Sequence, residues 1–283
     1  MNGNTQKKSL RADPFSLVMR VLVWGAALLT AGVLLALIAY ILIRGVPNLK
    51  LSLFELEYNS ENVSMFPSIV MTIYMTVLTL IITTPLGIGC AIYLTEYAKR
   101  GNKVVEVIRL AAETLSGIPS IVYGLFGMLF FVTALQWKNS ILAGSCTLAI
   151  MVLPLIIRST EEALKSVPDS YREASFGLGA GKLRTVVRVV LPPAMPGIVA
   201  GVILAVGRIV GETAALIYTA GTVAKITINP MESARTLAVH MYALSSEGLH
   251  TSEAFATGVV LLLVVLMLNA TSNAIAKRIT KGK

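Results

Sequence analysis

Six stretches of this sequence contain no charged residue over a length that can cross a lipid bilayer. About 18 to 20 helical residues span a hydrocarbon core that is about 30 Å thick. The stretches are residues 21–43, 62–95, 114–137, 139–157, 189–207 and 254–276. Each of them is predicted to be a transmembrane helix.

The composition also favours a membrane protein over a soluble domain. Hydrophobic residues make up 55% of the chain and charged residues 14%, and the mean hydropathy is +0.76. Soluble domains carry about 25% charged residues. A cleaved signal peptide is the alternative interpretation of the first stretch, but its apolar core would be shorter than the 23 residues of 21–43. We therefore expect an uncleaved membrane anchor.

The placement of lysine and arginine predicts the orientation in the membrane. Six spans put both termini on one side, together with the connections 96–113 and 158–188. That side carries 18 of the 24 Lys and Arg residues, and the other side carries 5. The positive-inside rule therefore places both termini in the cytoplasm of a multi-pass protein of the cell (inner) membrane. The basic residues are dispersed over short loops beside membrane segments, so the net charge of +9 indicates topology and not nucleic-acid binding.

No linker or repeat divides the chain, and we predict a single all-α, polytopic membrane domain with six transmembrane helices. Residues 1–20 are expected to form a cytoplasmic N-terminal tail, and residues 21–280 the transmembrane domain. Because the third and fourth spans are separated by a very short turn near Lys138, they are expected to pack as an antiparallel hairpin. The connection 158–188 is the long cytoplasmic one.

That cytoplasmic connection carries a helix-start signal followed by a stop. Ser170 and Glu173 have the spacing of a capping box, which predicts a short helix beginning near Tyr171. Glycines are expected to bend the chain behind it, because each costs about 1 kcal/mol relative to alanine inside a helix. These glycines are Gly177, Gly179 and Gly181. The prolines that suit the first turn of the fifth span are Pro192, Pro193 and Pro196.

Nucleotide and metal chemistry are not expected in this chain. The pair Gly181-Lys182 suggests a phosphate-binding loop, but Phe176 and Leu183 stand where the Walker pattern needs a glycine and a hydroxyl residue. Cys90 and Cys146 both lie within predicted spans, and the two histidines are too far apart for a zinc-ligand pattern. We predict a protein that is not an enzyme and has no metal site and no cofactor.

The cytoplasmic connection resembles the EAA motif of ABC importer permeases. The motif reads Glu-Ala-Ala, three residues, Gly, nine residues, Ile, one residue and Leu-Pro. Here Glu173 opens the run, Gly179 has the motif spacing, and Ser175 and Val189 are the two departures. Residues 84–101, 116–127 and 207–216 further resemble the phosphate permease subunits, PstA. The resemblance implies the type I ABC importer permease fold.

The resemblance also implies partners and a mechanism. In that family a PstA and a PstC permease pair in the membrane above two PstB ATPase subunits, which bind ATP and Mg²⁺, and a PstS protein delivers phosphate from outside. This chain would thus form half of an alternating-access pathway, with residues 171–179 as the coupling helix on the ATPase. The residues at that contact would be Tyr171, Arg172, Glu173, Ala174, Ser175 and Gly179.

Two charged residues, Arg208 and Glu212, stand at the end of the fifth apolar stretch, where ionisable side chains are costly and usually face a pathway or a partner. With helical geometry they share one stripe with Gly197 and Gly201, whose spacing is typical of close helix packing. One interpretation is that Arg208 binds a passing phosphate and that Glu212 pairs with it when the path is empty. The alternative is a purely structural ion pair.

Two weaker candidates and two rival functions remain open at this point. Residues 116–120 could expose backbone donors to an anion, although a structural helix start near the cytoplasmic face is favoured. Glu96 and Tyr97 are interpreted as an interfacial anchor with Lys99 and Arg100. The rival functions are an ABC permease for another oxyanion or small solute, and a membrane scaffold that senses phosphate.

Overall fold

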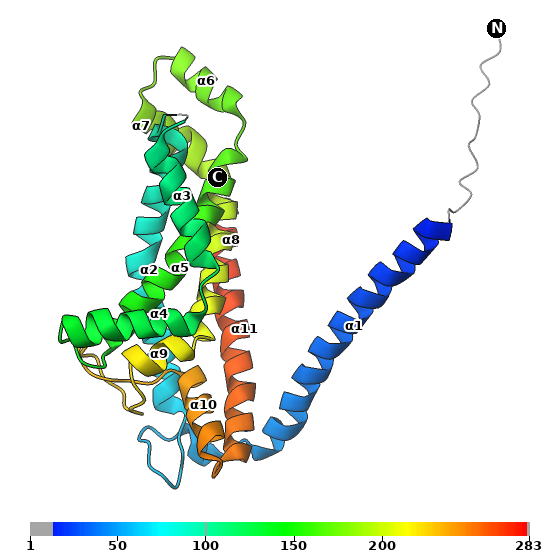
Figure 1. Cartoon of the computed structure of the whole chain (residues 1–283), viewed down its shortest axis with the longest axis vertical. Coiled ribbons are helices and arrows are strands. Elements are labelled where there is room, and N and C mark those ends of the chain that lie inside the picture. Colours follow the sequence, from blue (N-terminus) through cyan, green and yellow to red (C-terminus); the bar gives the residue numbers. More distant parts are fainter. Residues whose placement is uncertain (1–13, 100, 282–283) are drawn as a thin grey trace.

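The computed structural model describes residues 14–99 and 101–281, and all regular structure over these residues is helical (Figure 1). Residues 1–13 of the predicted tail lie outside the described residues. The α-helices are α1 (Pro14–Gly45), α2 (Phe66–Ile92), α3 (Lys103–Ser116), α4 (Ser120–Gly127), α5 (Ile141–Lys165), α6 (Asp169–Gly177), α7 (Lys182–Thr185), α8 (Leu191–Val210), α9 (Ala214–Thr219), α10 (Leu237–Glu247) and α11 (Thr251–Lys281). Short 3₁₀ turns cover Val46–Asn48 and Leu51–Phe54, and π-helical segments cover Tyr93–Tyr97, Met128–Ala134 and Val186–Val190. The all-α prediction is confirmed.

Five of the predicted spans are single helical stretches long and apolar enough to cross a membrane. They are Phe15–Asn48, Phe66–Tyr97, Ile141–Lys165, Lys182–Val210 and Thr251–Ala274. A sixth is formed only if α3 and the helix Ser120–Ala134, which meet at a bend of 106°, count as one span. The described chain therefore has five or six spans.

The third predicted span was wrong in its limits and its shape. The stretch 114–137 is not one helix, because the chain breaks at Gly117–Pro119 between α3 and α4. Pro119 disfavours helical geometry at the residue before it. In addition, α3 begins at Lys103, and its 14 residues make about 21 Å of helix. Residues 116–120 consequently lie one helix length away from Lys103 and are exposed or half-buried, so a helix does start at Ser120 but not at the end of the bundle where it was expected.

The predicted hairpin between the third and fourth spans does not form. In Figure 1, α4 lies across the long helices and does not run antiparallel to α5. Its main neighbour is α9, and at Gly124 the two helices are so close that a Cβ atom would stand 2.8 Å from the Cα of Ala215. Both helices are short pieces that follow a chain break, so they pair with each other at mid-bundle.

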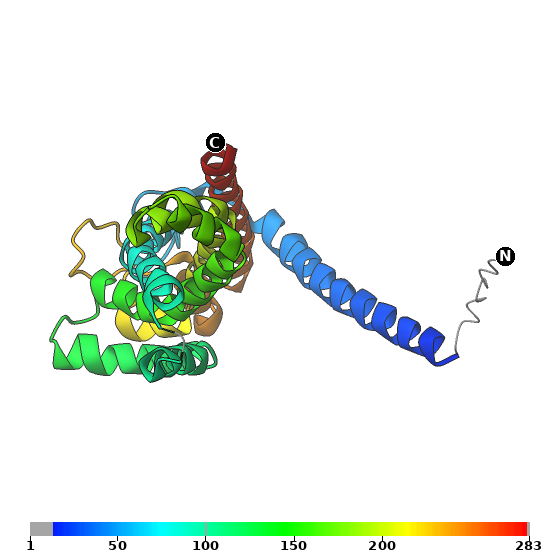
Figure 2. The same cartoon turned by 90° about the horizontal axis from the view of Figure 1, so that it is seen from above.

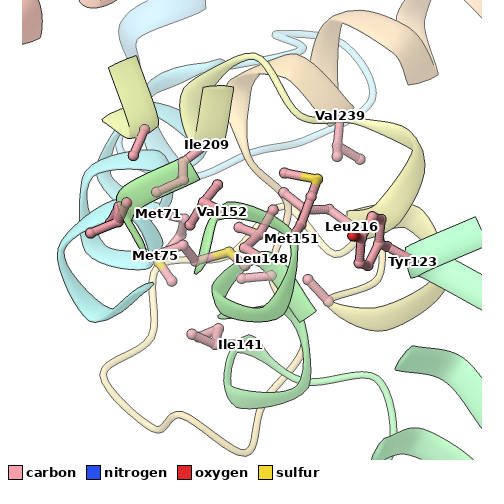
Figure 3. Packing of buried hydrophobic residues seen from close by; sticks show 14 residues of the cluster. Met71, Met75, Tyr123, Ile141, Leu148, Met151, Val152, Ile209, Leu216 and Val239 are labelled. Atoms are coloured by element: carbon pink, nitrogen blue, oxygen red, sulfur yellow. The ribbon is translucent and has the colours of Figure 1, made fainter. Parts of the chain in front are cut away.

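The core of the bundle is built around α5, the most buried of the five long spans. Apolar side chains from α2, α4, α8, α9 and α10 converge on it (Figure 3). The largest buried members include Met71, Met75, Leu148, Met151, Ile209 and Leu216. Figure 1 shows α6 at one end of this bundle and α10 with the start of α11 at the opposite end.

Helix α1 projects away from the bundle, as Figure 2 shows, and touches α11 at the end nearest Gly45. Tyr40 and Phe255 make an edge-to-face contact there, with ring centroids 5.5 Å apart. Over the rest of α1 large apolar side chains such as Trp24 and Leu29 are exposed. In a membrane this surface must be covered by lipid or by another transmembrane chain.

Helix α8 approaches α5 closely at two glycines on its face. A Cβ atom at Gly197 would lie 2.7 Å from the Cβ of Ala163, and a Cβ at Gly201 would overlap the side chain of Ser159. The small-residue spacing thus serves packing within this chain.

We expect Gly201→Ala to destabilise the protein by about 1–3 kcal/mol, because the added methyl overlaps Ser159 in a packed helix interface. Thermal or denaturant unfolding of the purified protein in detergent measures the effect. Gly89→Ala is the matched control, since a Cβ atom there meets nothing within 4 Å. Adding Ser159→Gly to Gly201→Ala should restore stability. Equal stability of the Gly201 and Gly89 variants would contradict the packing argument.

Candidate functional site

The α6 helix starts differently from the predicted capping box. It begins at Asp169, with Pro168 as N-cap and no side-chain capping hydrogen bond, so Ser170 and Glu173 do not form the box. Pro168 has φ −58° and ψ 140°, an extended conformation that proline favours and that leads directly into a helix. The start is therefore two residues before Tyr171.

The glycine bend behind α6 is confirmed. Gly179 has φ +78°, a left-handed conformation that residues with a side chain rarely adopt. The turn is closed by hydrogen bonds from the Gly179 amide to the Phe176 carbonyl and from the Ala180 amide to the Ser175 carbonyl, at 2.9 and 3.1 Å. The helix therefore stops one residue after Phe176, and the chain reverses toward α7.

Ser175, one of the two departures from the EAA motif, fixes α6 against α7. Its hydroxyl lies 2.8 Å from the hydroxyl of Thr185, and both side chains are buried. An alanine at this position would pack but could not make this bond. The serine that replaces alanine in the motif thus has a hydrogen-bond partner in Thr185, ten residues further along the chain.

Arg172 anchors α6 to the end of α2. Its guanidinium binds both carboxylate oxygens of Glu96, with the shortest contact 2.7 Å from Nη2 to Oε1. It also donates to the carbonyls of Leu164 and Val167 at 2.9 and 2.8 Å, and to Asp169 at 3.2 Å. The side chains of Arg172 and Glu96 are only 14% and 7% exposed. Glu96 holds the Arg172 guanidinium charged and raises its pKa.

The interpretation of Glu96 as an interfacial anchor with Lys99 is wrong, because the partner of Glu96 is Arg172. Arg100, which was grouped with Lys99 in that interpretation, lies outside the described residues. The two residues are 76 positions apart in sequence. In the sequence, the only signal for this contact was an acidic residue at the end of a predicted span. That signal did not identify Arg172 as the partner of Glu96. The pair also lines a cavity of about 510 Å³ between α3 and α6.

The remaining residues of the motif face outward at the tip of the molecule. Tyr171 and Phe176 are about half exposed, and Glu173, Ala174 and Gly179 are exposed as well. Leu178 is 90% exposed. The motif therefore has two sides: Arg172 and Ser175 hold the helix to the bundle, and the opposite side exposes a mixed aromatic and apolar surface.

Arg208 and Glu212 do not form the expected pair on one helix face. Helix α8 ends at Val210, so Glu212 lies beyond it. Over the described part of the chain no ion pair joins them; instead the buried Glu212 carboxylate accepts hydrogen bonds from the amides of Thr213 and Ala215 at 3.2 and 3.1 Å. These amides are at the start of α9, whose unsatisfied N–H groups attract a carboxylate.

Arg208 is left half-buried at the junction of two chain breaks. The hydroxyl of Tyr123 in α4 donates to the Leu115 carbonyl in the last turn of α3 at 2.7 Å, across the break between these two helices. Helices α4 and α9, which follow these two breaks, pack together at Gly124 and Ala215, and Arg208 is in the last turn of α8 just before the second break. Irregular backbone at membrane depth is tolerated where it lines a cavity or is buried in protein.

Comparison with known proteins gives the family of this chain. Residues 83–282 match the family described as "Binding-protein-dependent transport system inner membrane component". The probable ABC transporter permease protein YqgI of Bacillus subtilis is 36% identical over 273 residues, which cover 90% of this chain and 92% of that protein. The phosphate transport system permease protein PstA 1 of Mycobacterium tuberculosis is 40% identical over 141 residues, which are 50% of this chain and 46% of that protein.

A solved structure shows the same fold. A chain of a bacterial alginate ABC transporter superposes with a TM-score of 0.66 at 16% identity, covering 95% of this chain and 98% of that one. The family match extends over most of the sequence, and the relative from B. subtilis matches nine tenths of it. This chain therefore belongs to the binding-protein-dependent transport system inner membrane components, and it is a multi-pass permease of an ABC importer with the type I importer permease fold.

Proposed function

We propose that the substrate is inorganic phosphate and that this chain forms one half of the translocation pathway. The similarity to PstA supports this proposal, because a relative that is 40% identical over 141 residues is named as a phosphate permease. The chemistry of Arg208 supports it. A half-buried guanidinium that makes no ion pair with Glu212 can offer a planar set of donors to an oxyanion.

The other half of the pathway would be a second, PstC-like permease. Its surface would cover part of the exposed apolar face that α1 and the bundle present to the membrane. A PstS-like protein would deliver phosphate at the end that carries α10, and a PstB-like ATPase dimer would bind at the end that carries α6. In this orientation both termini are cytoplasmic. ATP and Mg²⁺ would bind to the ATPase subunits, and this chain would need no cofactor and catalyse no reaction.

Coupling would run from α6 to Arg208. The outward residues of α6, including Tyr171 and Glu173, would dock on the ATPase, and the Arg172–Glu96 pair would make α6 move together with the end of α2. Helical structure then continues from Lys182 to Val210 as one span, with a π-helical segment at Val186–Val190. A rigid-body shift of α6 would thus reach Arg208 at the far end of this span.

The proposal is tested by reconstituting the complex in vesicles. The tagged chain is first co-purified with its partner permease and ATPase, and the binding protein is then added. We expect ATP hydrolysis to be stimulated by phosphate-loaded binding protein and to be accompanied by phosphate uptake. Stimulation by sulfate or molybdate in place of phosphate would indicate the alternative, a permease for another oxyanion. Phosphate-regulated association without uptake would indicate a sensing scaffold.

A further inference from the structure

The largest concentration of unsatisfied buried polar atoms lies at the end of the molecule opposite α6. Arg235 is 6% exposed and His240 is fully buried. Neither Nε nor Nη2 of Arg235 has a hydrogen-bond partner, and neither ring nitrogen of His240 has one. Buried polar groups are nearly always hydrogen-bonded, and a buried guanidinium without an acceptor is especially costly. The described chain thus leaves two guanidinium N–H groups and one imidazole N–H without an acceptor here.

The backbone holds these two residues firmly in place. The Arg235 amide donates to the Val223 carbonyl at 3.0 Å, and the next residue, Thr236, caps α10. The Leu237 amide donates to the hydroxyl of Thr72 in α2 at 2.8 Å. Arg235 and His240 are thus positioned by the contact of α10 with α2, and not by a mobile loop.

Tyr58 lies against both side chains. The Arg235 guanidinium carbon is 4.4 Å from the centroid of the Tyr58 ring, and the His240 ring is 6.1 Å from it in edge-to-face geometry. The ring covers the face of the guanidinium. The edge that carries Nε and Nη2 has no hydrogen-bond partner, and such an edge is the fork that can bind one oxyanion through two parallel hydrogen bonds.

No acid of the described residues neutralises Arg235. Two acids close to this cluster in sequence have other partners: Glu232 pairs with Lys225 at 3.1 Å, and Glu55 accepts from Asn62 at 2.7 Å. Burial, and secondly the charge of Arg235, lower the pKa of His240 to about 3, although the Val63 carbonyl lies near its ring. His240 is therefore neutral at physiological pH and can donate one N–H to an anion.

We propose that Arg235 and His240, covered by Tyr58, form a binding site for a small oxyanion at the outer end of the permease. The inference rests on the proposed import of phosphate, because it assigns an entry site from which the anion passes inward to Arg208. This site belongs to the end of the molecule that carries α10 (Figure 1), whereas Arg208 is in the last turn of α8. The site is distinct from the Arg208 junction in both its residues and its position.

The test measures thermal unfolding of the purified membrane complex, without binding protein, against inorganic phosphate. All variants carry Arg208→Gln, so that phosphate at that junction does not contribute. We expect phosphate to raise the melting temperature, because a ligand that binds the folded state stabilises it. Arg235→Met should raise the half-saturating phosphate concentration roughly 10- to 100-fold, as expected for the loss of hydrogen bonds from a charged group.

Arg235→Met should not lower the melting temperature without phosphate, because it removes a buried charge that has no partner. Lys225→Met is the matched control, a cation in the same outer segment, and should leave the phosphate effect unchanged. Absence of any phosphate effect, or an equal effect in the Arg235 variant, would overturn the proposal. The proposal would also be overturned if Arg235→Met weakened docking of the binding protein and left the phosphate effect unchanged. In that case Arg235 would bind a carboxylate of the binding protein. Phosphate-stimulated hydrolysis by the otherwise wild-type complex checks the import proposal separately.

Discussion

Replacing Arg208 by glutamine is expected to abolish phosphate uptake while the complex still assembles. In our proposal the guanidinium offers two charge-assisted hydrogen bonds to the passing anion, and their loss should lower uptake by at least about 100-fold. Assembly should persist because Arg208 makes no ion pair with Glu212, so its removal leaves no buried carboxylate unpaired. Uptake of labelled phosphate in cells that lack their own permease measures the first effect, and co-purification of the partner subunits measures the second.

Glu212→Gln is the variant that separates the two interpretations of this region. The glutamine oxygen can still accept from the Thr213 and Ala215 amides, so α9 keeps its cap and uptake should stay near normal. If the two residues instead formed a structural ion pair, both substitutions would impair folding to a similar degree. Normal uptake by the Arg208 variant, or failure of that variant to assemble, would contradict the role proposed for Arg208.

The sequence predicted the spans best where one helix alone carries the signal. Helices α1, α2, α5, α8 and α11 are long and apolar enough to be recognised without knowledge of their neighbours. For α3 this approach failed because the helix is charged. Its Arg109 pairs with Glu161 of α5, at 2.6 Å, and that pair is invisible in a search for charge-free runs. The third span was consequently placed too late in the chain.

The candidate site was predictable in its motif but not in its contacts. The spacing of Glu173 and Gly179 located α6, since the bend after a helix depends on the residues beside it. The inward direction of Arg172 depends on Glu96, which is 76 positions away in sequence. Likewise, the residue at which α8 ends depends on packing around α9. Because α8 ends at Val210, Glu212 caps the start of α9 and does not pair with Arg208.

The second large effect is expected at Arg172, whose replacement by alanine should uncouple ATP hydrolysis from uptake. The substitution leaves Glu96 buried without its cation, a cost of about 3–5 kcal/mol, and removes the donors to the Leu164 and Val167 carbonyls. Helix α6 would then move on the ATPase without moving the end of α2. The number of phosphate ions taken up per ATP hydrolysed by reconstituted vesicles should fall sharply while hydrolysis continues.

Two further variants distinguish lost coupling from lost stability. Asp169→Asn removes a partner of Arg172 whose own side chain, that of Asp169, is 73% exposed. This substitution should lower the free energy of unfolding by less than about 1 kcal/mol and should preserve coupling. The double variant Glu96→Gln/Arg172→Met leaves no buried charge unpaired, so its stability should recover, but α6 would still lack its anchor and uptake per ATP should stay low. If the double variant regained wild-type coupling, or if Arg172→Ala kept it, the pair would only stabilise the fold. Transmission from α6 would then have to run through the Ser175–Thr185 contact and the continuous helix that leads to Arg208.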